Sequence, residues 1–208
     1  MKTTLYLIRH GQTEWNAQGR MQGRMDSPLT DKGVRMAERL AMDFPKAGTV
    51  YSSPIGRAMQ TARIIFGDRE VRADNRLREI NLGDWEGRLQ ADLDIEDAEE
   101  HSNFWKAPHL CQPPAGENFQ HVEARSVECL RELAARHEGE SIAIVSHTTV
   151  IRSMLFAVEP RPLSAFWSPP AIYPASLSEI DVVDGRFNIA RFGDITHYDP
   201  QDQPTGAY

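Results

Sequence analysis

Short apolar runs alternate along this chain with longer stretches in which apolar residues recur every three or four positions. The short runs predict buried strands at residues 5–8, 49–52, 71–72, 141–146, 177–183 and 187–192. The three-to-four spacing predicts amphipathic helices at residues 31–44, after Ser53-Pro54, and at residues 117–137 and 150–158. Strands that alternate with helices over most of a chain are typical of an α/β protein with a mostly parallel sheet.

Two of the predicted helices have clear start signals. Thr30 is the expected N-cap of the first helix, and Ser53 is the expected N-cap of the second, with Pro54 at its first helical position. Arg57 then falls in the first turn, where a cation opposes the helix dipole. A single helical arginine is usually an exposed surface residue, but an anion bound at this N-terminus would offset the unfavourable charge.

Polar residues follow the predicted strands at the points where they end. Arg9, His10 and Gly11 follow the first strand, and His147 follows the strand at residues 141–146. The carboxyl ends of parallel strands share one edge, where ligands bind. A guanidinium beside a neutral imidazole suits the transfer of a phosphoryl group. The Arg-His-Gly tripeptide alone favours a structural histidine. The presence of His147 and Arg57 at the same edge of the sheet favours a catalytic histidine instead.

The middle of the chain adds an acidic candidate and an irregular segment. Glu79 lies between apolar residues in a loop with glycine and tryptophan, a setting that favours a general acid. An ion pair with Arg76 or Arg78 is the equally weighted alternative. From residue 90 to residue 114 the sequence becomes irregular and acidic, and its charged run is expected to be a solvated helix face. An insertion there would overhang the site and determine the substrate.

Length and charge narrow the class of protein. A chain of 208 residues suits one well-buried domain, and its net charge of -7 argues against nucleic-acid or anionic-membrane partners. No apolar run approaches the roughly 20 residues of a membrane span. The first strand follows Met1 so closely that no signal peptide is expected, which predicts a cytoplasmic protein. Cys111 and Cys129 lack metal-site or redox spacing.

In order and spacing, these segments resemble the histidine phosphatase superfamily, also called phosphoglycerate mutase-like. The matching segments are Leu7–Asn16, Gly19–Gly23, Asp26–Thr30, Ser52–Ala58, Leu77–Glu79 and Val145–His147. The resemblance implies a three-layer α/β/α sandwich with a mostly parallel central sheet. It also implies a single domain over residues 1–208, with a variable substrate cap at about residues 90–116.

The resemblance further implies a role for each matching residue. His10 would be the nucleophile that forms a phosphohistidine, while Arg9, Arg57 and His147 would bind the phosphoryl group. Glu79 would donate the proton to the leaving alcohol. Asn16, Gln22 and Gly23 would complete the site that binds the phosphoryl group. No metal and no cofactor is implied, because the two arginines supply the positive charge and would repel a cation.

The chain departs from the family pattern at two positions. Thr148 stands where glycine is usual. Either its Cβ narrows the approach of the phosphate to the backbone N–H, or its hydroxyl adds a donor to the substrate site. Pro174 stands where many members have asparagine, which affects the late loop but not the catalytic set.

Three functions remain open at this point. Hydrolysis of a small-molecule phosphate ester to inorganic phosphate is favoured, as in α-ribazole and broad-specificity phosphatases. A cofactor-dependent phosphoglycerate mutase is the first alternative, but residues 90–114 carry acidic groups with Lys106 as the only lysine or arginine, which opposes a multiply anionic substrate. A catalytically silent phospho-ligand binding protein is the second. Phe104 and Trp105 are candidates for a site that binds the leaving group. The sequence carries no signal that specifies an oligomeric state.

Overall fold

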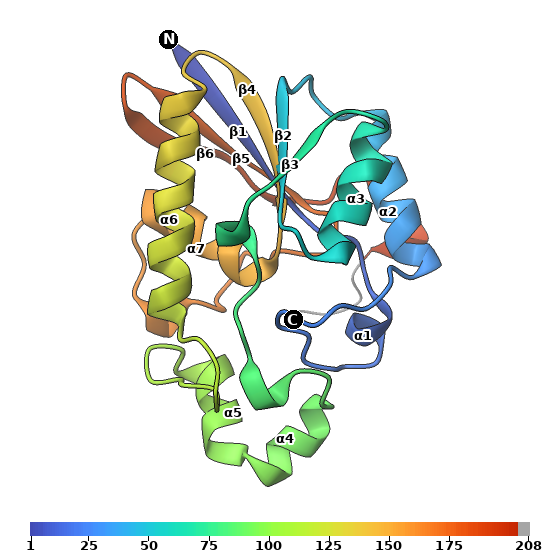
Figure 1. Cartoon of the computed structure of the whole chain (residues 1–208), viewed down its shortest axis with the longest axis vertical. Coiled ribbons are helices and arrows are strands. Elements are labelled where there is room, and N and C mark those ends of the chain that lie inside the picture. The colour runs from blue at the N-terminus through green and yellow to red at the C-terminus, as the bar shows by residue number, and fades with distance from the viewer. Residues whose placement is uncertain (204–208) are drawn as a thin grey trace.

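The computed structural model describes residues 1–203, and a six-stranded sheet runs through its centre (Figure 1). The strand order is β3-β2-β4-β1-β5-β6. The first four of these are parallel, and β5 and β6 add an antiparallel edge. The strand bounds are β1 Lys2–Arg9, β2 Thr49–Ser52, β3 Val71–Ala73, β4 Ser141–Ser146, β5 Leu177–Val183 and β6 Arg186–Asp194.

Helices cover both faces of this sheet. In Figure 1, α2 (Asp31–Met42) and α3 (Gly56–Phe66) lie on one side, and α6 (Phe119–Arg136) and α7 (Thr148–Val158) lie on the other. Side chains of a strand alternate between faces. Accordingly, Leu5 and Leu7 of β1 pack with residues of α6 and α7, whereas Tyr6 and Ile8 pack with residues of α2 and α3. The predicted three-layer α/β/α sandwich with a mostly parallel sheet is confirmed.

The predicted start of α3 is wrong. The helix begins at Gly56, with Ile55 as an N-cap that makes no side-chain capping bond. The carboxylate of Asp26 accepts the Arg57 N–H at 3.1 Å, so a distant residue satisfies this helix N-terminus. The hydroxyl of Ser53 accepts the N–H of Ile55 at 3.3 Å, and it also lies 2.8 Å from Nε2 of His147. Ser53 therefore makes its local bond just ahead of the helix, and the first turn of α3 is satisfied by a tertiary contact with Asp26.

The segment after residue 90 is more regular than predicted. It forms two helices, α4 (Gln90–Glu96) and α5 (Ala98–Lys106), which lie beyond the ends of the strands at the foot of Figure 1. Leu93 and Phe104 anchor them in the core. The expected solvated helix face is present, because Asp92, Asp94 and Glu96 are exposed. The short helix α1 (Glu14–Ala17) was not predicted either, and Thr13 caps it.

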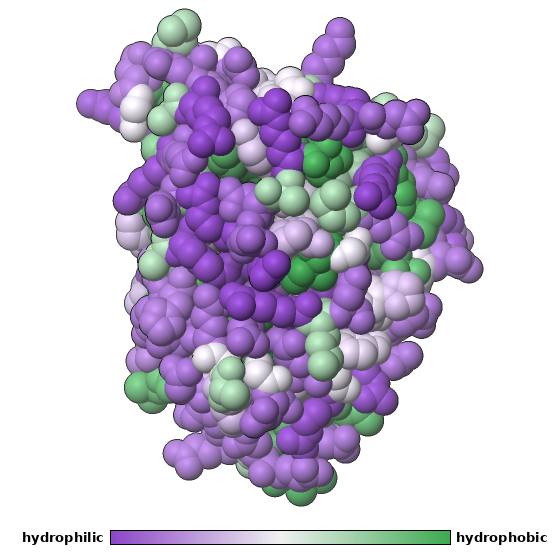
Figure 2. Space-filling model, viewed as in Figure 1, coloured by the Kyte–Doolittle hydropathy of each residue, from purple (hydrophilic) through white to green (hydrophobic). Residues whose placement is uncertain are grey.

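The face of the molecule shown in Figure 2 is mostly hydrophilic, with apolar residues in separate patches. Within residues 1–203, no helix has the length and apolar character needed to cross a membrane.

Candidate active site

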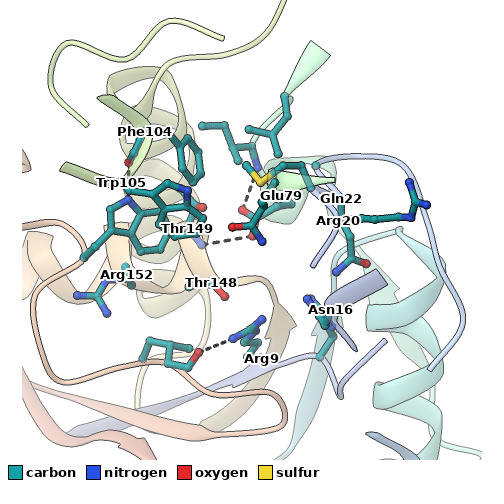
Figure 3. Close-up of a pocket in the computed structure, with 18 of the residues that line it drawn as sticks. Arg9, Asn16, Arg20, Gln22, Glu79, Phe104, Trp105, Thr148, Thr149 and Arg152 are labelled. Atoms are coloured by element: carbon teal, nitrogen blue, oxygen red, sulfur yellow. Dashed lines mark hydrogen bonds between the residues drawn. The ribbon is translucent and has the colours of Figure 1, made fainter. Parts of the chain in front are cut away.

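A cavity of about 510 Å³ opens at the carboxyl ends of β1 and β4, between the sheet and the helices α4 and α5. Figure 3 shows its labelled lining residues. All of the predicted site residues except His147 line this cavity: Arg9, His10, Asn16, Gln22, Gly23, Arg57, Glu79 and Thr148. The prediction that the strand ends and the Glu79 loop meet at one edge is confirmed.

His10 is held with one ring nitrogen available for attack. Its Nδ1 lies 2.8 Å from the carbonyl oxygen of Gly11, which can only accept a hydrogen bond, so Nδ1 carries the proton. The lone pair is therefore on Nε2. The Nε–H of Arg57 donates to this nitrogen at 3.3 Å, a long bond that a ligand oxygen can replace.

Arg57 connects three parts of the site. Besides His10, its guanidinium donates to the carbonyl oxygens of Gly23 at 2.7 Å and Met25 at 2.6 Å. Arg57 is buried, and burial lowers its pKa against the opposing effects of Glu79 and Asp26. A guanidinium keeps its proton in proteins, so this is a fixed positive charge beside the nucleophilic nitrogen.

Arg9 supplies a second guanidinium on the other side of the cavity floor. Its Nη1 donates to the carbonyl oxygen of Ile172 at 2.6 Å, as drawn in Figure 3. This bond ties the end of β1 to the loop before β5. The two arginines thus reach the same cavity from β1 and α3.

His147 lies beside His10 rather than in the cavity wall. The two ring centroids are 5.1 Å apart. His147 is fully buried, its Nε2 contacts Ser53 Oγ, and its Nδ1 has no hydrogen-bond partner within residues 1–203. The predicted strand end is where His147 lies. Its side chain, however, is buried beside His10 and does not line the cavity.

The pKa values of both histidines are shifted in the same direction. Burial, followed by the charge of Arg57, lowers the pKa of His10 well below its ordinary value of 6.5. The same two causes, in the same order, lower the pKa of His147. Both rings are therefore neutral near neutral pH, as a nucleophilic imidazole must be.

Glu79 faces the cavity and does not form the alternative ion pair. Its Oε1 accepts the N–H of Ile80 at 2.9 Å, and its Oε2 lies 3.4 Å from the N–H of Thr149 at the start of α7 (Figure 3). Arg76 pairs instead with Asp74 and Glu132. The ion pair with Arg76 is therefore excluded, no ion pair joins Glu79 to Arg78 within residues 1–203, and the carboxyl group lines the cavity.

The amides of Asn16 and Gln22 are oriented by Thr13. Asn16 Oδ1 lies 3.1 Å from the N–H of Thr13, and Gln22 Oε1 lies 2.9 Å from its hydroxyl. With the oxygens engaged, the amide nitrogens are the donor ends, and both side chains point toward Arg9 in Figure 3. Gly23 has a positive φ of 54°, and a Cβ there would meet the Glu86 carboxylate.

Sequence reasoning assigned no role to Glu86, although it organises the loop next to the arginines. Its carboxylate accepts the backbone N–H groups of Arg24 at 2.8 Å, Met25 at 3.0 Å and Leu82 at 3.0 Å. Asp26, which satisfies the N-terminus of α3, was missed for the same reason. Apart from Leu82, their partners lie 31 to 62 residues away in sequence, so no local pattern could have found these contacts.

Within the part of the chain that the structure describes, no three His, Cys, Asp or Glu side chains gather in a way that could hold a metal ion. The charged groups beside His10 are arginines, which bind anions. Two guanidiniums, oriented amides and a neutral imidazole with an unprotonated Nε2 form a site suited to phosphoryl transfer.

This class of site agrees with the comparison to known families. Residues 5–195 match the histidine phosphatase superfamily (branch 1), and the chain belongs to that family. It is 34% identical to phosphoserine phosphatase 1 of Hydrogenobacter thermophilus, over 79% of this chain and 80% of that protein. It is 33% identical to the adenosylcobalamin/alpha-ribazole phosphatase of Escherichia coli, over 78% of this chain and 82% of that protein.

A solved structure agrees with the fold. The structure of Bacillus stearothermophilus YhfR superposes with a TM-score of 0.90 at 44% sequence identity, covering 94% of this chain and 98% of that one. The protein is thus a phosphomonoesterase of the histidine phosphatase family.

Proposed function

We propose that this enzyme hydrolyses small phosphomonoesters through a phosphohistidine on Nε2 of His10, without a metal ion. The contact of His10 Nδ1 with the Gly11 carbonyl oxygen is the observation that carries the proposal. The Gly11 carbonyl holds the proton on Nδ1, so the lone pair of Nε2 faces the arginine-lined end of the cavity. The lowered pKa of His10 keeps this lone pair available below neutral pH.

The first step transfers the phosphoryl group to the enzyme. Nε2 of His10 attacks phosphorus, and the bond between phosphorus and the ester oxygen breaks. Arg9 and Arg57 stabilise the equatorial oxygens, with the amides of Asn16 and Gln22 as further donors. Glu79, in its acid form, gives its proton to the departing oxygen, so the alcohol leaves neutral.

The second step returns the enzyme to its starting state. Glu79, now a carboxylate, takes a proton from water, and the oxygen of that water attacks phosphorus. The bond between phosphorus and Nε2 breaks, inorganic phosphate leaves, and His10 is neutral again. His147 lies against the reacting ring and Thr148 adds a hydroxyl at the cavity wall, so we assign both to binding the phosphoryl group.

Hydrolysis is favoured over a mutase reaction by the charge of α4 and α5. Asp94 of α4 lines the cavity, whereas Lys106 of α5 does not. An exposed carboxylate at the entrance opposes a substrate with several negative charges. We assign residues 90–116 as a cap that covers the leaving group within a single domain.

The test measures inorganic phosphate released from a panel of phosphomonoesters in the presence of a chelator. We expect metal-independent release that His10→Ala abolishes and that His121→Ala, at an exposed histidine on α6, leaves unchanged. After brief mixing with a ³²P-labelled ester, label should stay on the wild-type chain under alkaline denaturing conditions, where phosphohistidine survives. Unchanged turnover in His10→Ala would refute the mechanism.

The same panel separates the alternatives. Isomerisation of 3-phosphoglycerate without phosphate release would identify a mutase. Tight binding of phosphate esters with no turnover would identify a silent binding protein.

A further inference from the structure

The cavity continues beyond the arginines to a wall of aromatic rings. Phe104 and Trp105 of α5 form this wall with Trp167. In Figure 3, Phe104 and Trp105 lie across the cavity from Arg9 and Asn16. The rings pack together, with centroid distances of 4.9 Å for Phe104 and Trp105, and 5.0 Å for Trp105 and Trp167. This end of the cavity is where the alcohol of a phosphate ester would lie.

The polar edge of each indole in this aromatic wall is engaged within the protein. Trp167 Nε1 donates to the Phe104 carbonyl at 2.6 Å, and Trp105 Nε1 donates to His101 Nε2 at 3.2 Å. His101 Nε2 therefore accepts, and its Nδ1 donates to Asp94 Oδ1 at 2.9 Å. With both indoles fixed, the aromatic wall is already formed before a ligand enters, which reduces the entropic cost of binding.

The exposure of Trp105 points to a ligand that covers it. The core of this protein buries most of its large aromatic rings, yet Trp105, which lines the cavity, is 38% exposed. Apolar surface left open in a pocket marks a binding area. A cavity of about 510 Å³ also falls in the range of sites for whole small molecules, so it can hold much more than a phosphoryl group.

Asp94 is the acidic group at this end of the cavity. Its side chain is 69% exposed, and within residues 1–203 only one of its carboxylate oxygens, Oδ1, is engaged, by His101. The neighbouring cations are otherwise engaged. Arg20 donates to Gln18 and to the carbonyl of Gly87, and its guanidinium points away from the cavity in Figure 3. Arg152 donates through all three nitrogens to the carbonyl oxygens of Phe166, Ser168 and Pro170.

We propose that the preferred substrates are phosphomonoesters whose alcohol carries a flat aromatic ring with a hydrogen-bond donor or positive charge on it. The ring stacks on the aromatic wall, and the donor group reaches the free oxygen of Asp94. This inference rests on the proposed function, because it places the ester phosphate at His10. It makes Trp105 and Asp94 specificity-determining residues of the reaction.

Three alkyl esters test the inference without changing the reacting bond. Ethyl phosphate, 2-phenylethyl phosphate and 2-(4-aminomethylphenyl)ethyl phosphate all leave as primary alcohols. We expect kcat/KM for the phenylethyl ester to exceed that of ethyl phosphate by about 10-fold, the effect of one stacked ring. The aminomethyl group should add about 3-fold, the effect of a partly exposed ion pair.

Two variants assign these preferences to residues. Trp105→Leu should reduce the ratio of phenylethyl to ethyl kcat/KM toward one. Asp94→Asn retains an acceptor for His101 and should reduce only the ratio of aminomethyl to phenylethyl ester. Asp92→Asn, on the exposed face of the same helix and outside the cavity lining, is the matched control and should leave both ratios unchanged.

The outcomes separate this inference from the proposed function. Equal kcat/KM for the ethyl and phenylethyl esters, with release still dependent on His10, would overturn the inference alone. If no ester is hydrolysed, calorimetry with His10→Ala measures the affinity for the same three esters. The same ranking of affinities would support the aromatic site, and equal affinities would overturn it.

Discussion

Acid should destabilise this protein through its two active-site histidines. His10 and His147 are buried, and burial with the charge of Arg57 lowers the pKa of each. Below about pH 6.5 the unfolded chain binds a proton at each histidine, while the folded protein does not. The free energy of unfolding therefore falls as pH falls, by about 1.4 kcal/mol per pH unit for each histidine. This loss continues down to the lowered pKa of the folded state.

The substitution His10→Gln isolates one of these contributions. Because glutamine does not titrate, the variant should lose about 1.4 kcal/mol less than wild type for each pH unit below 6, when both are unfolded with urea. Phosphate must be absent from the buffers, since an anion bound to the folded state would mask the effect. His121→Gln changes an exposed histidine and should retain the wild-type slope.

One result would refute the reasoning. If His10→Gln and wild type lose stability equally between pH 6.5 and pH 5, then His10 takes up its proton in the folded protein. The ring would then be protonated below its ordinary pKa of 6.5, and the lone pair that the mechanism needs would be lost in that range. The kcat/KM profile gives a second check, because its acid limb should lie below the ordinary histidine pKa.

Three further substitutions test residues that hold the active site in its observed geometry. Arg57→Lys cannot contact His10, Gly23 and Met25 together, and kcat/KM for phosphate release should fall by about 10²–10³-fold. Glu86→Gln keeps the shape but weakens three backbone hydrogen bonds, so urea unfolding should show a loss of about 1–3 kcal/mol together with reduced turnover. In Gly33→Ala the new Cβ would lie 2.1 Å from the Gln12 carbonyl oxygen, and a loss of about 3 kcal/mol is expected. Gly48→Ala is its control, because the nearest atom to a Cβ there is 3.4 Å away.

The central sheet could be predicted because its strands are marked by local patterns. Residues 142–145 are apolar without interruption, and they lie within β4, which is buried from residue 142 to residue 146. Arg9, His10 and Arg57 could be placed together because parallel strands deliver their carboxyl ends to one edge. The two helices after residue 90 were harder to predict, since packing of Leu93 and Phe104 stabilises them rather than a long apolar stripe.

The sequence by itself determined the α/β class, the strand ends and the residue types that meet there. Only the tertiary structure decided how those residues are oriented: the proton of His10 on Nδ1, the contact of Ser53 with His147, and the contacts of Glu86 with a loop about 60 residues away. The physical reason is the range of the interactions. Strand and helix patterns depend on neighbours in sequence, whereas hydrogen-bond partners and burial depend on segments that folding brings together.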